Sequence, residues 1–310
     1  MKTTTILRTI ALTGAVIAIG QQVSAQGYRL DIKTNKELQT FFKYTGKNRP
    51  IISGHRGGMV KGFPENSIET FENTLRYTPA FYEIDPRFTK DSVVVLMHDA
   101  TLDRTTNGTG KLADYTYAEI QKLRLKDVHG NVTNAKIPTL KEVIEWSKGR
   151  TVMNLDKKDL PIEYTAKLLK TFNNQVVMVT VHDAQQAKFY YQDNPDRMMS
   201  AFVKTKEAFA SYEAAGVPWK NMIAYIGPLN KPENKELYDL LHAKGVMCMI
   251  SSAPTYDKLE NPEERAKHFR DTFNQGADIL ESDLPIEVAE AIKGLVKKGS
   301  AQDKFIKGNK

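Results

Sequence analysis

A histidine and an arginine stand at the end of a short apolar run, in Gly54-His55-Arg56-Gly57-Gly58 after Pro50–Ser53. Histidine titrates near neutral pH and can move a proton, while arginine can hold a phosphate. Glycines let a ligand come close to the backbone, and a phosphate-handling site often begins at such a strand end. A histidine in an ordinary glycine-rich turn gives the same pattern, so the stretch alone does not establish a site.

Carboxylates follow two further apolar runs, in Glu83-Ile84-Asp85 and in Asn154-Leu155-Asp156-Lys157-Lys158. Side chains alternate along a strand, so Glu83 and Asp85 point one way, and Asp156 and Lys158 share a side. Paired carboxylates repel each other unless a cation neutralises them, and their oxygens are ligands that Mg²⁺ or Ca²⁺ prefers. A lysine beside such a site can hold a substrate phosphate. A solvated pair at a strand rim remains the alternative.

A second histidine, in His98-Asp99, follows the apolar run Val93–Met97. Cleaving a phosphodiester requires one group to take a proton from the attacking hydroxyl and another to protonate the leaving alkoxide. Histidine can do either. His55 and His98 are therefore candidates for such a pair, provided that the fold brings both to the same place.

Short apolar runs alternate with amphipathic helical stretches along most of the chain. The predicted strands are Ile51–Gly54, Phe81–Asp85, Val152–Leu155, Val176–Val181, Met199–Val203, Met222–Ile226, Val246–Ile250 and Asp278–Glu281. This pattern predicts parallel βαβ units and an α/β TIM barrel, a (β/α)8 fold whose site lies at the carboxyl ends of its strands. Pro86 is expected to end the second strand. Residues 91–140 break the pattern and predict a small insertion after that strand, over the barrel mouth.

Several motifs in chain order resemble the glycerophosphodiester phosphodiesterase family, within the phosphatidylinositol-phospholipase-C-like phosphodiesterases. They are Gly54-His55-Arg56-Gly57, Pro64-Glu65-Asn66-Ser67, Glu83-Ile84-Asp85, His98-Asp99 with Leu102 to Gly110, Ile137 to Leu140, Asn154 to Lys158 and Asp283-Leu284-Pro285. The resemblance implies a (β/α)8 barrel that hydrolyses glycerophosphodiesters to glycerol 3-phosphate and an alcohol with a divalent cation.

Carried to this sequence, the resemblance implies that one cation, Mg²⁺ or Ca²⁺, is held by Glu83, Asp85 and Asp156. It places Arg56 and Lys158 on the substrate phosphate. In this family the third metal-binding carboxylate is usually a glutamate. In having an aspartate, Asp156, at this position, the chain resembles the related spider sphingomyelinase D barrels.

The same resemblance makes His55 and His98 the acid–base pair, with either order of roles possible. Glu65, His182 and Glu281 are further candidates to line the pocket. A phospholipase on the same barrel, of the D type or acting on inositol lipids, and a non-catalytic exported ligand-binding protein are the alternatives.

The first 25 residues of the 310-residue chain predict export. Lys2 and Arg8, an apolar core and Val23-Ser24-Ala25 have the layout of a signal peptide over residues 1–25, which implies a periplasmic or secreted protein. Residues 26–49 are expected to form a lead-in, residues 50–298 the barrel, and residues 299–310 a loose tail. The single cysteine, Cys248, excludes an intramolecular disulfide.

The formal net charge of +7 suits an anionic small-molecule substrate. The lysines are dispersed and form no basic stripe with interleaved aromatic residues, which argues against nucleic acid as a partner. No segment predicts stable insertion into a membrane, and the pattern does not indicate an oligomeric state.

Overall fold

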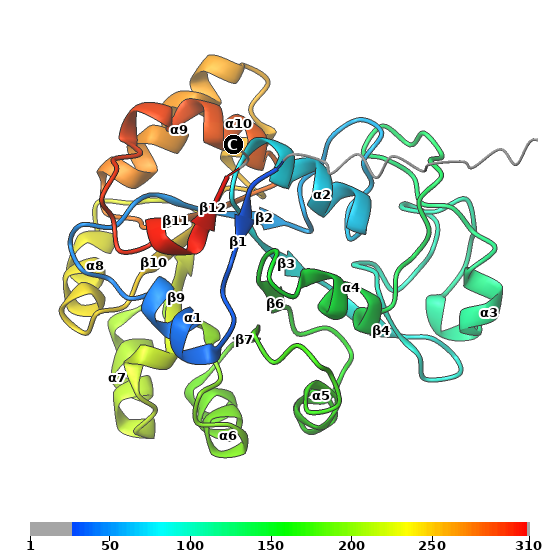
Figure 1. Cartoon of the computed structure of the whole chain (residues 1–310), viewed down its shortest axis with the longest axis horizontal. Coiled ribbons are helices and arrows are strands. Elements are labelled where there is room, and N and C mark those ends of the chain that lie inside the picture. The colour runs from blue at the N-terminus through cyan, green and yellow to red at the C-terminus, as the bar shows by residue number, and fades with distance from the viewer. Residues whose placement is uncertain (1–26, 309–310) are drawn as a thin grey trace, which may run out of the picture.

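The structure of the chain, a computed structural model, describes residues 27–308, and a closed barrel of parallel strands forms its centre (Figure 1). The barrel strands are β2 (Ile51–His55), β3 (Phe81–Ile84), β6 (Met153–Leu155), β7 (Val177–Val181), β8 (Met199–Phe202), β9 (Met222–Gly227), β10 (Cys248–Ser251) and β11 (Ile279–Ser282). They lie in chain order around the barrel, which closes where β11 pairs with β2. The predicted signal peptide lies outside the described residues.

A helix follows each barrel strand and covers its outer face. These helices are α2 (Ile68–Tyr77), α4 (Leu140–Ser147), α5 (Ile162–Leu169), α6 (Ala184–Asp193), α7 (Lys206–Ala215), α8 (Asn234–Ala243), α9 (Pro262–Asn274) and α10 (Pro285–Ala291). The alternation of strand and helix in the sequence therefore predicted the fold class correctly.

Alternation along each strand divides its side chains between an outer core and the barrel interior. On β2, Ile52 packs in the outer core with Phe71 of α2, whereas Ile51 belongs to a second core inside and below the barrel. Ser53 and His55 lie on the same face of β2 as Ile51, towards the barrel interior, but nearer the carboxyl end of the strand. The interior is thus apolar at its base and polar towards the mouth.

The lead-in and the end of the chain close the base of the barrel together. The lead-in contains β1 (Arg29–Leu30) and α1 (Asn35–Phe41), and β1 pairs with the last strand, β12 (Ile306–Lys307). Phe305 is buried against the ring of Phe41, with 5.9 Å between the ring centroids, and Gln302 Nε2 donates to the Phe41 carbonyl at 3.0 Å. The prediction of a loose tail is therefore wrong up to residue 308, because a buried phenylalanine and a short strand pairing anchor it.

The insertion contains β4 (Pro86–Phe88), β5 (Val94–Leu96) and α3 (Tyr117–Ile120), and it extends to one side of the barrel (Figure 1). It has its own small core, which includes Val95, Leu102 and Ile120. As expected, the barrel strand β3 ends before Pro86, and Pro86 then begins a separate strand, β4, which pairs with β5. A proline is tolerated there because the first residue of an edge strand need not donate a hydrogen bond.

The insertion borders the barrel mouth. Asp127 of the insertion accepts a hydrogen bond from the Gly62 amide, in the loop after β2, at 2.9 Å. Arg87 of the insertion pairs with Asp159, in the loop after β6, at 3.4 Å. Although loss of hydration opposes the shift, hydrogen bonds from Gly62, Asn131 and the neighbouring backbone lower the pKa of Asp127 to about 2. Within residues 27–308, none of the helices is both long and apolar enough to cross a membrane.

Candidate active site

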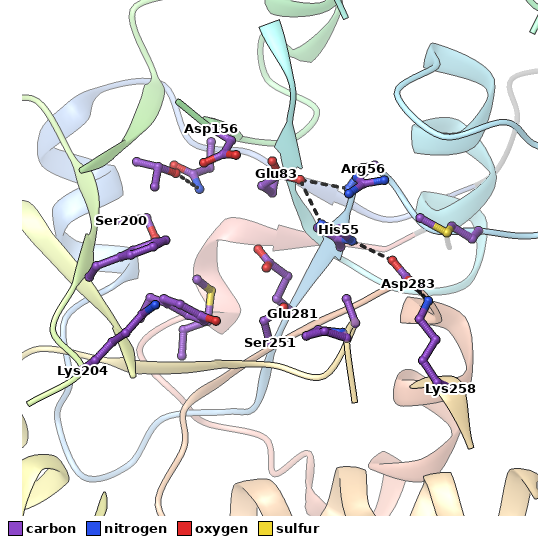
Figure 2. Close-up of a pocket in the computed structure, with 18 residues that line it drawn as sticks. His55, Arg56, Glu83, Asp156, Ser200, Lys204, Ser251, Lys258, Glu281 and Asp283 are labelled. Atoms are coloured by element: carbon purple, nitrogen blue, oxygen red, sulfur yellow. Dashed lines mark hydrogen bonds and ion pairs between the residues drawn. The ribbon is translucent and has the colours of Figure 1, made fainter. Parts of the chain in front are cut away.

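A cavity of about 450 Å³ opens at the carboxyl ends of the barrel strands. His55, Arg56, Glu83 and Asp156 line one part of it, and Glu281 lies near its centre (Figure 2). These side chains come from strands that are distant in sequence but adjacent in the barrel. Alternate side chains of each strand face the barrel interior, and closure of the barrel brings these side chains together in one cavity.

The carboxylates of Glu83, Asp85 and Asp156 form a cluster in which one oxygen of each lies within 4.8 Å of the others. Glu83 and Asp85 are buried. Burial and the charges of Asp85 and Asp156 raise the pKa of Glu83 well above its usual value. Three crowded oxygen donors with an unfavourable shared negative charge fit a hard divalent cation. The three predicted ligands are therefore brought together.

Two cations lie against this cluster. Lys158 Nζ is 2.5 Å from Asp156 Oδ2 and 2.9 Å from Asp85 Oδ1, and Arg56 Nε is 3.4 Å from Asp85 Oδ2. Arg56 also lines the cavity, as a phosphate-binding residue must. Lys158 is not among the described residues that line it, since its ammonium group lies between the two aspartates. Its contact with phosphate stays a prediction.

His55 is held by a carboxylate that the motif analysis did not assign a role. Its Nδ1 lies 2.7 Å from Asp283 Oδ1, which comes from the loop directly after β11, and Asp283 also pairs with Lys258 at 2.8 Å (Figure 2). Burial opposes ionisation of Asp283, but the hydrogen bonds and charges of His55 and Lys258 together outweigh it and lower the pKa of this carboxyl. An ionised Asp283 keeps the proton on Nδ1 of His55, which leaves Nε2, 3.9 Å from Glu83 Oε2, free of a proton.

Burial lowers the pKa of His55, but the bond to Asp283 and the charge of Glu281 have the larger combined effect and raise it above its usual value. Glu281 is itself buried, lines the cavity and accepts from Ser53 Oγ at 3.3 Å. His55 and Glu281 thus occupy the interior positions that the sequence indicated.

This combination of a cavity, a carboxylate cluster and an Asp-bound histidine can be compared with known proteins. A model of the Glycerophosphoryl diester phosphodiesterase family matches residues 55–256. The chain belongs to this family. The resemblance predicted from the motifs is confirmed.

A crystal structure of a glycerophosphoryl diester phosphodiesterase from Parabacteroides distasonis is 55% identical, with a TM-score of 0.89 over 91% of this chain and 99% of that one. Glycerophosphodiester phosphodiesterase 1 of Bos taurus is 41% identical over 101 residues, which are 32% of this chain and 30% of that relative's length. A phosphodiesterase of Oleispira antarctica, solved in complex with the product sn-glycerol-3-phosphate, shares the fold at 21% identity, with a TM-score of 0.60 over 79% of this chain and 97% of that one.

The family motif Pro64-Glu65-Asn66-Ser67 supports the cluster from behind. The Asn66 side chain donates to Asp85 Oδ2 at 2.7 Å and accepts from the Asp85 amide at 3.2 Å, so it fixes a predicted cation ligand. Ser67 caps α2 by accepting from the Thr70 amide. Glu65 pairs with Arg56 at 3.1 Å and is not among the described residues that line the cavity, contrary to expectation.

The glycines of the opening family motif contact protein, although they were expected to admit a ligand. Gly57 has a φ of 94°, and an added Cβ would lie 2.7 Å from the ring of Phe71 on α2. A Cβ on Gly54 would lie 2.8 Å from Tyr82. These glycines therefore allow α2 and β3 to pack closely against the loop that carries His55 and Arg56.

The second family histidine, His98, lies on the insertion and outside the set of described residues that line the cavity. Its Nδ1 is 2.7 Å from Asp99 Oδ1. Arg104 then joins Asp99, at 2.7 Å, to Glu65, at 2.7 Å. Since Glu65 also contacts Arg56, a continuous chain of charged groups ties His98 to the barrel.

His182 follows β7 and lies beside the cavity. Its Nε2 is 3.9 Å from Asp156 Oδ1, and its ring stacks on Phe202 with 4.4 Å between the centroids. It is not among the described lining residues, so the expectation that it lines the pocket is not met. It packs against two residues that do line the cavity.

Sequence reasoning gave no role to Asp283, Asn66 or Arg104. Each stands within or next to a family motif, so the motifs contained a signal. Their partners lie 228 residues away for Asp283, 19 for Asn66 and 39 for Arg104, which local periodicity cannot reveal.

Proposed function

We propose that this protein hydrolyses glycerophosphodiesters to glycerol 3-phosphate and an alcohol with the help of one divalent cation, Mg²⁺ or Ca²⁺. The observation that carries the proposal is the meeting of Asp283-bound His55, Arg56 and the carboxylate cluster in one cavity. Membership of the family supports the same reaction class. The complex of the Oleispira antarctica relative with sn-glycerol-3-phosphate supports that product.

Glu83, Asp85 and Asp156 are the residues that would hold the cation. When bound, it would supply positive charge to neutralise these carboxylates and to act as a Lewis acid towards the phosphoryl oxygens. The three carboxylates carry one more negative charge than Arg56 and Lys158 carry positive charges. Without a cation, the cluster would therefore repel a phosphodiester monoanion. Arg56 then binds a phosphate oxygen and stabilises the charge that develops there.

His55 acts as the general base in this proposal. Its Nε2 takes a proton from the attacking oxygen, which belongs to water or to the substrate's neighbouring hydroxyl, as that oxygen forms a bond to phosphorus. Asp283 stabilises the positive imidazolium that results, at 2.7 Å from Nδ1. The phosphorus–oxygen bond to the alcohol breaks in the same displacement. Attack by water gives glycerol 3-phosphate directly, whereas attack by the hydroxyl gives a cyclic glycerophosphate that a water molecule then opens.

His98 acts as the general acid and protonates the departing alkoxide. The support for this role is its bond to Asp99, which leaves Nε2 available, and its tether to Arg56 through Arg104 and Glu65. Substrates with nitrophenol as the alcohol need less protonation than those with choline. His98→Ala should therefore lose less kcat on the nitrophenyl substrate, and equal losses on both would contradict the assignment.

A panel of glycerophosphodiesters, assayed for release of glycerol 3-phosphate with and without chelator, tests the reaction. Release that stops with chelator and returns with Mg²⁺ or Ca²⁺ is the expected result. Faster attack on intact lipid vesicles than on any glycerophosphodiester would favour a phospholipase. Binding of the diesters without turnover in saturating cation would favour the ligand-binding alternative.

We also propose export, on the basis of the signal-like residues 1–25. Fractionation of the native host and mass spectrometry of the mature protein test it. An amino terminus near Gln26 in the periplasmic or secreted fraction is expected, and an intact Met1 in the cell interior would refute it.

A further inference from the structure

The cavity has a second wall, built by residues on and after β6 to β9. Asn154, Thr180, Ser200 and Tyr225 contribute to it, and Lys204 reaches over it from the end of β8. Lys204 and Ser200 lie across the cavity from His55 and Asp283 (Figure 2). A phosphodiester bound near His55 and Arg56 would extend one of its two arms towards this wall.

Lys204 covers the aromatic surface of the wall. Its Nζ lies 4.5 Å from the ring centroid of Phe202 and 5.1 Å from that of Tyr225. Without Lys204, adjacent aromatic faces of this kind would suit a quaternary ammonium group, which binds to rings by cation–π attraction. With Lys204 present, those faces already carry a cation, which would repel a second one.

Asn154 adds an unpaired acceptor to the same wall. Its side chain is 1% exposed and its Nδ2 donates to Thr180 Oγ1 at 3.1 Å, whereas its Oδ1 has no hydrogen-bond partner among the described residues. A buried acceptor without a partner is unfavourable, and a hydroxyl donor from a ligand would satisfy it. Lys204 and the Ser200 hydroxyl can donate to hydroxyl oxygens in turn.

We infer that this wall binds the glycerol arm of the diester and thereby decides which ester bond is broken. Glycerol offers hydroxyls that donate to Asn154 and accept from Lys204, whereas a choline arm offers no donor and carries a repelled charge. The alcohol arm is then directed away from the wall, and the bond to the alcohol is the one cleaved. In the reverse orientation the products from glycerophosphocholine would be glycerol and phosphocholine.

This inference rests on the proposed diester hydrolysis, and product analysis with glycerophosphocholine tests it separately. Wild-type enzyme should release glycerol 3-phosphate and choline. Lys204→Met frees the aromatic faces for trimethylammonium, so the share of glycerol and phosphocholine among the products should rise at least about tenfold. Lys204→Arg keeps the cation and should retain the wild-type product ratio.

Lys206→Met is the matched control, since it removes the same charge two positions further along. Lys206 Nζ pairs with Glu236 at 3.0 Å at an exposed position and is not among the described residues that line the cavity. It should leave both the product ratio and the rate unchanged. An unchanged ratio in Lys204→Met with a lower overall rate would overturn the inference while leaving the hydrolysis itself in place.

Binding without turnover gives an independent measurement. By titration calorimetry in saturating Mg²⁺, Lys204→Met should bind glycerol 3-phosphate more weakly and phosphocholine more tightly than the wild type does. Equal changes for both ligands would refute orientation by this wall, whether or not the protein hydrolyses any diester of the panel.

Discussion

Replacing Asp283 by asparagine removes the negative charge beside His55 and keeps the size of the side chain. In the wild type, Asp283 accepts from His55 Nδ1 at 2.7 Å, and the two side chains are 5% and 21% exposed. The amide of asparagine can also donate, which permits the tautomer of His55 whose Nε2 carries the proton. That tautomer cannot take a proton from the attacking oxygen.

The size of the effect follows from the bond that is lost. A hydrogen bond between charged groups contributes about 1.5–3 kcal/mol, and each ~1.4 kcal/mol is a factor of ten in rate. If this stabilisation is present mainly when His55 is protonated in the transition state, kcat falls by about 10- to 150-fold. KM should change less than about threefold, because Asp283 is not one of the residues proposed to bind the phosphate.

Steady-state kinetics on a glycerophosphodiester in saturating cation measures kcat and KM separately. Lys258→Met is the control, since it removes the other partner of Asp283 from a side chain that is 62% exposed. Because the lysine end of this pair lies in solvent, the pair should contribute about 1 kcal/mol, so this variant should keep kcat within about fivefold. If Asp283→Asn keeps kcat within threefold of the wild type, or if both variants lose the same activity, Asp283 does not act through His55.

Other predictions concern the cluster, the insertion and the base of the barrel. Glu83→Gln removes one of three carboxylates that repel each other, so the Tm of this variant in chelator should rise, and the further rise in Tm on adding Mg²⁺ should be smaller than in the wild type. Calorimetric scans with and without Mg²⁺ measure both changes. An undiminished effect of Mg²⁺ would contradict the assignment of Glu83 as a cation ligand. Arg104→Gln should lower kcat about tenfold with little loss of stability, because it loosens the insertion at a half-exposed position. Steady-state kinetics beside urea unfolding checks this, and an unchanged kcat would exclude the tether. Phe305→Ala should reduce the free energy of unfolding by about 3 kcal/mol and leave kcat unchanged, as urea titration and the same assay can establish. The pKa of Asp127 is lowered to about 2, so its stabilisation is complete above its ordinary pKa and lost as pH falls through about 2. Asp127→Asn should therefore lower Tm at pH 7, and this difference from the wild type should shrink as the pH falls below about 4.

Local sequence patterns predicted the parts of the fold that depend on neighbours in the chain. The period of two placed Glu83 and Asp85 on one side, and the alternation of strand and helix gave all the barrel strands within a few residues. Such patterns are set by backbone geometry within a single element. The tail could not be predicted in this way, because Phe305 stands in a segment too short to show any period.

The relation between distant residues was the part that the sequence did not reveal. Asp283 reaches His55 only because the last barrel strand, β11, closes the barrel against the first barrel strand, β2. Lys158 shares a side with Asp156, as alternation predicted, yet its ammonium group is drawn between Asp156 and Asp85. The balance of nearby charges in three dimensions decided that placement, and the spacing of residues along one strand does not contain it.

The two histidines are each oriented by an aspartate, but they belong to parts of the molecule with different support. His55 and Asp283 come from strand ends of the closed barrel, where the hydrogen bonds between parallel strands fix the backbone on both sides. His98 and Asp99 come from the insertion, which has a separate core. The distance between the two proton-transfer groups therefore depends on how firmly the insertion is attached to the mouth.

Near the site, Arg104 is the residue that connects the insertion to the barrel. It contacts Asp99 on its own segment and Glu65 on the loop after β2, and Glu65 in turn contacts Arg56. A cation placed between two carboxylates stabilises both positions at once, whereas its loss would leave two negative charges to repel each other. The same interaction that orients His98 thus also positions Arg56, so the proposed general acid and the proposed phosphate-binding residue are coupled through a side chain that is not among the described residues lining the cavity.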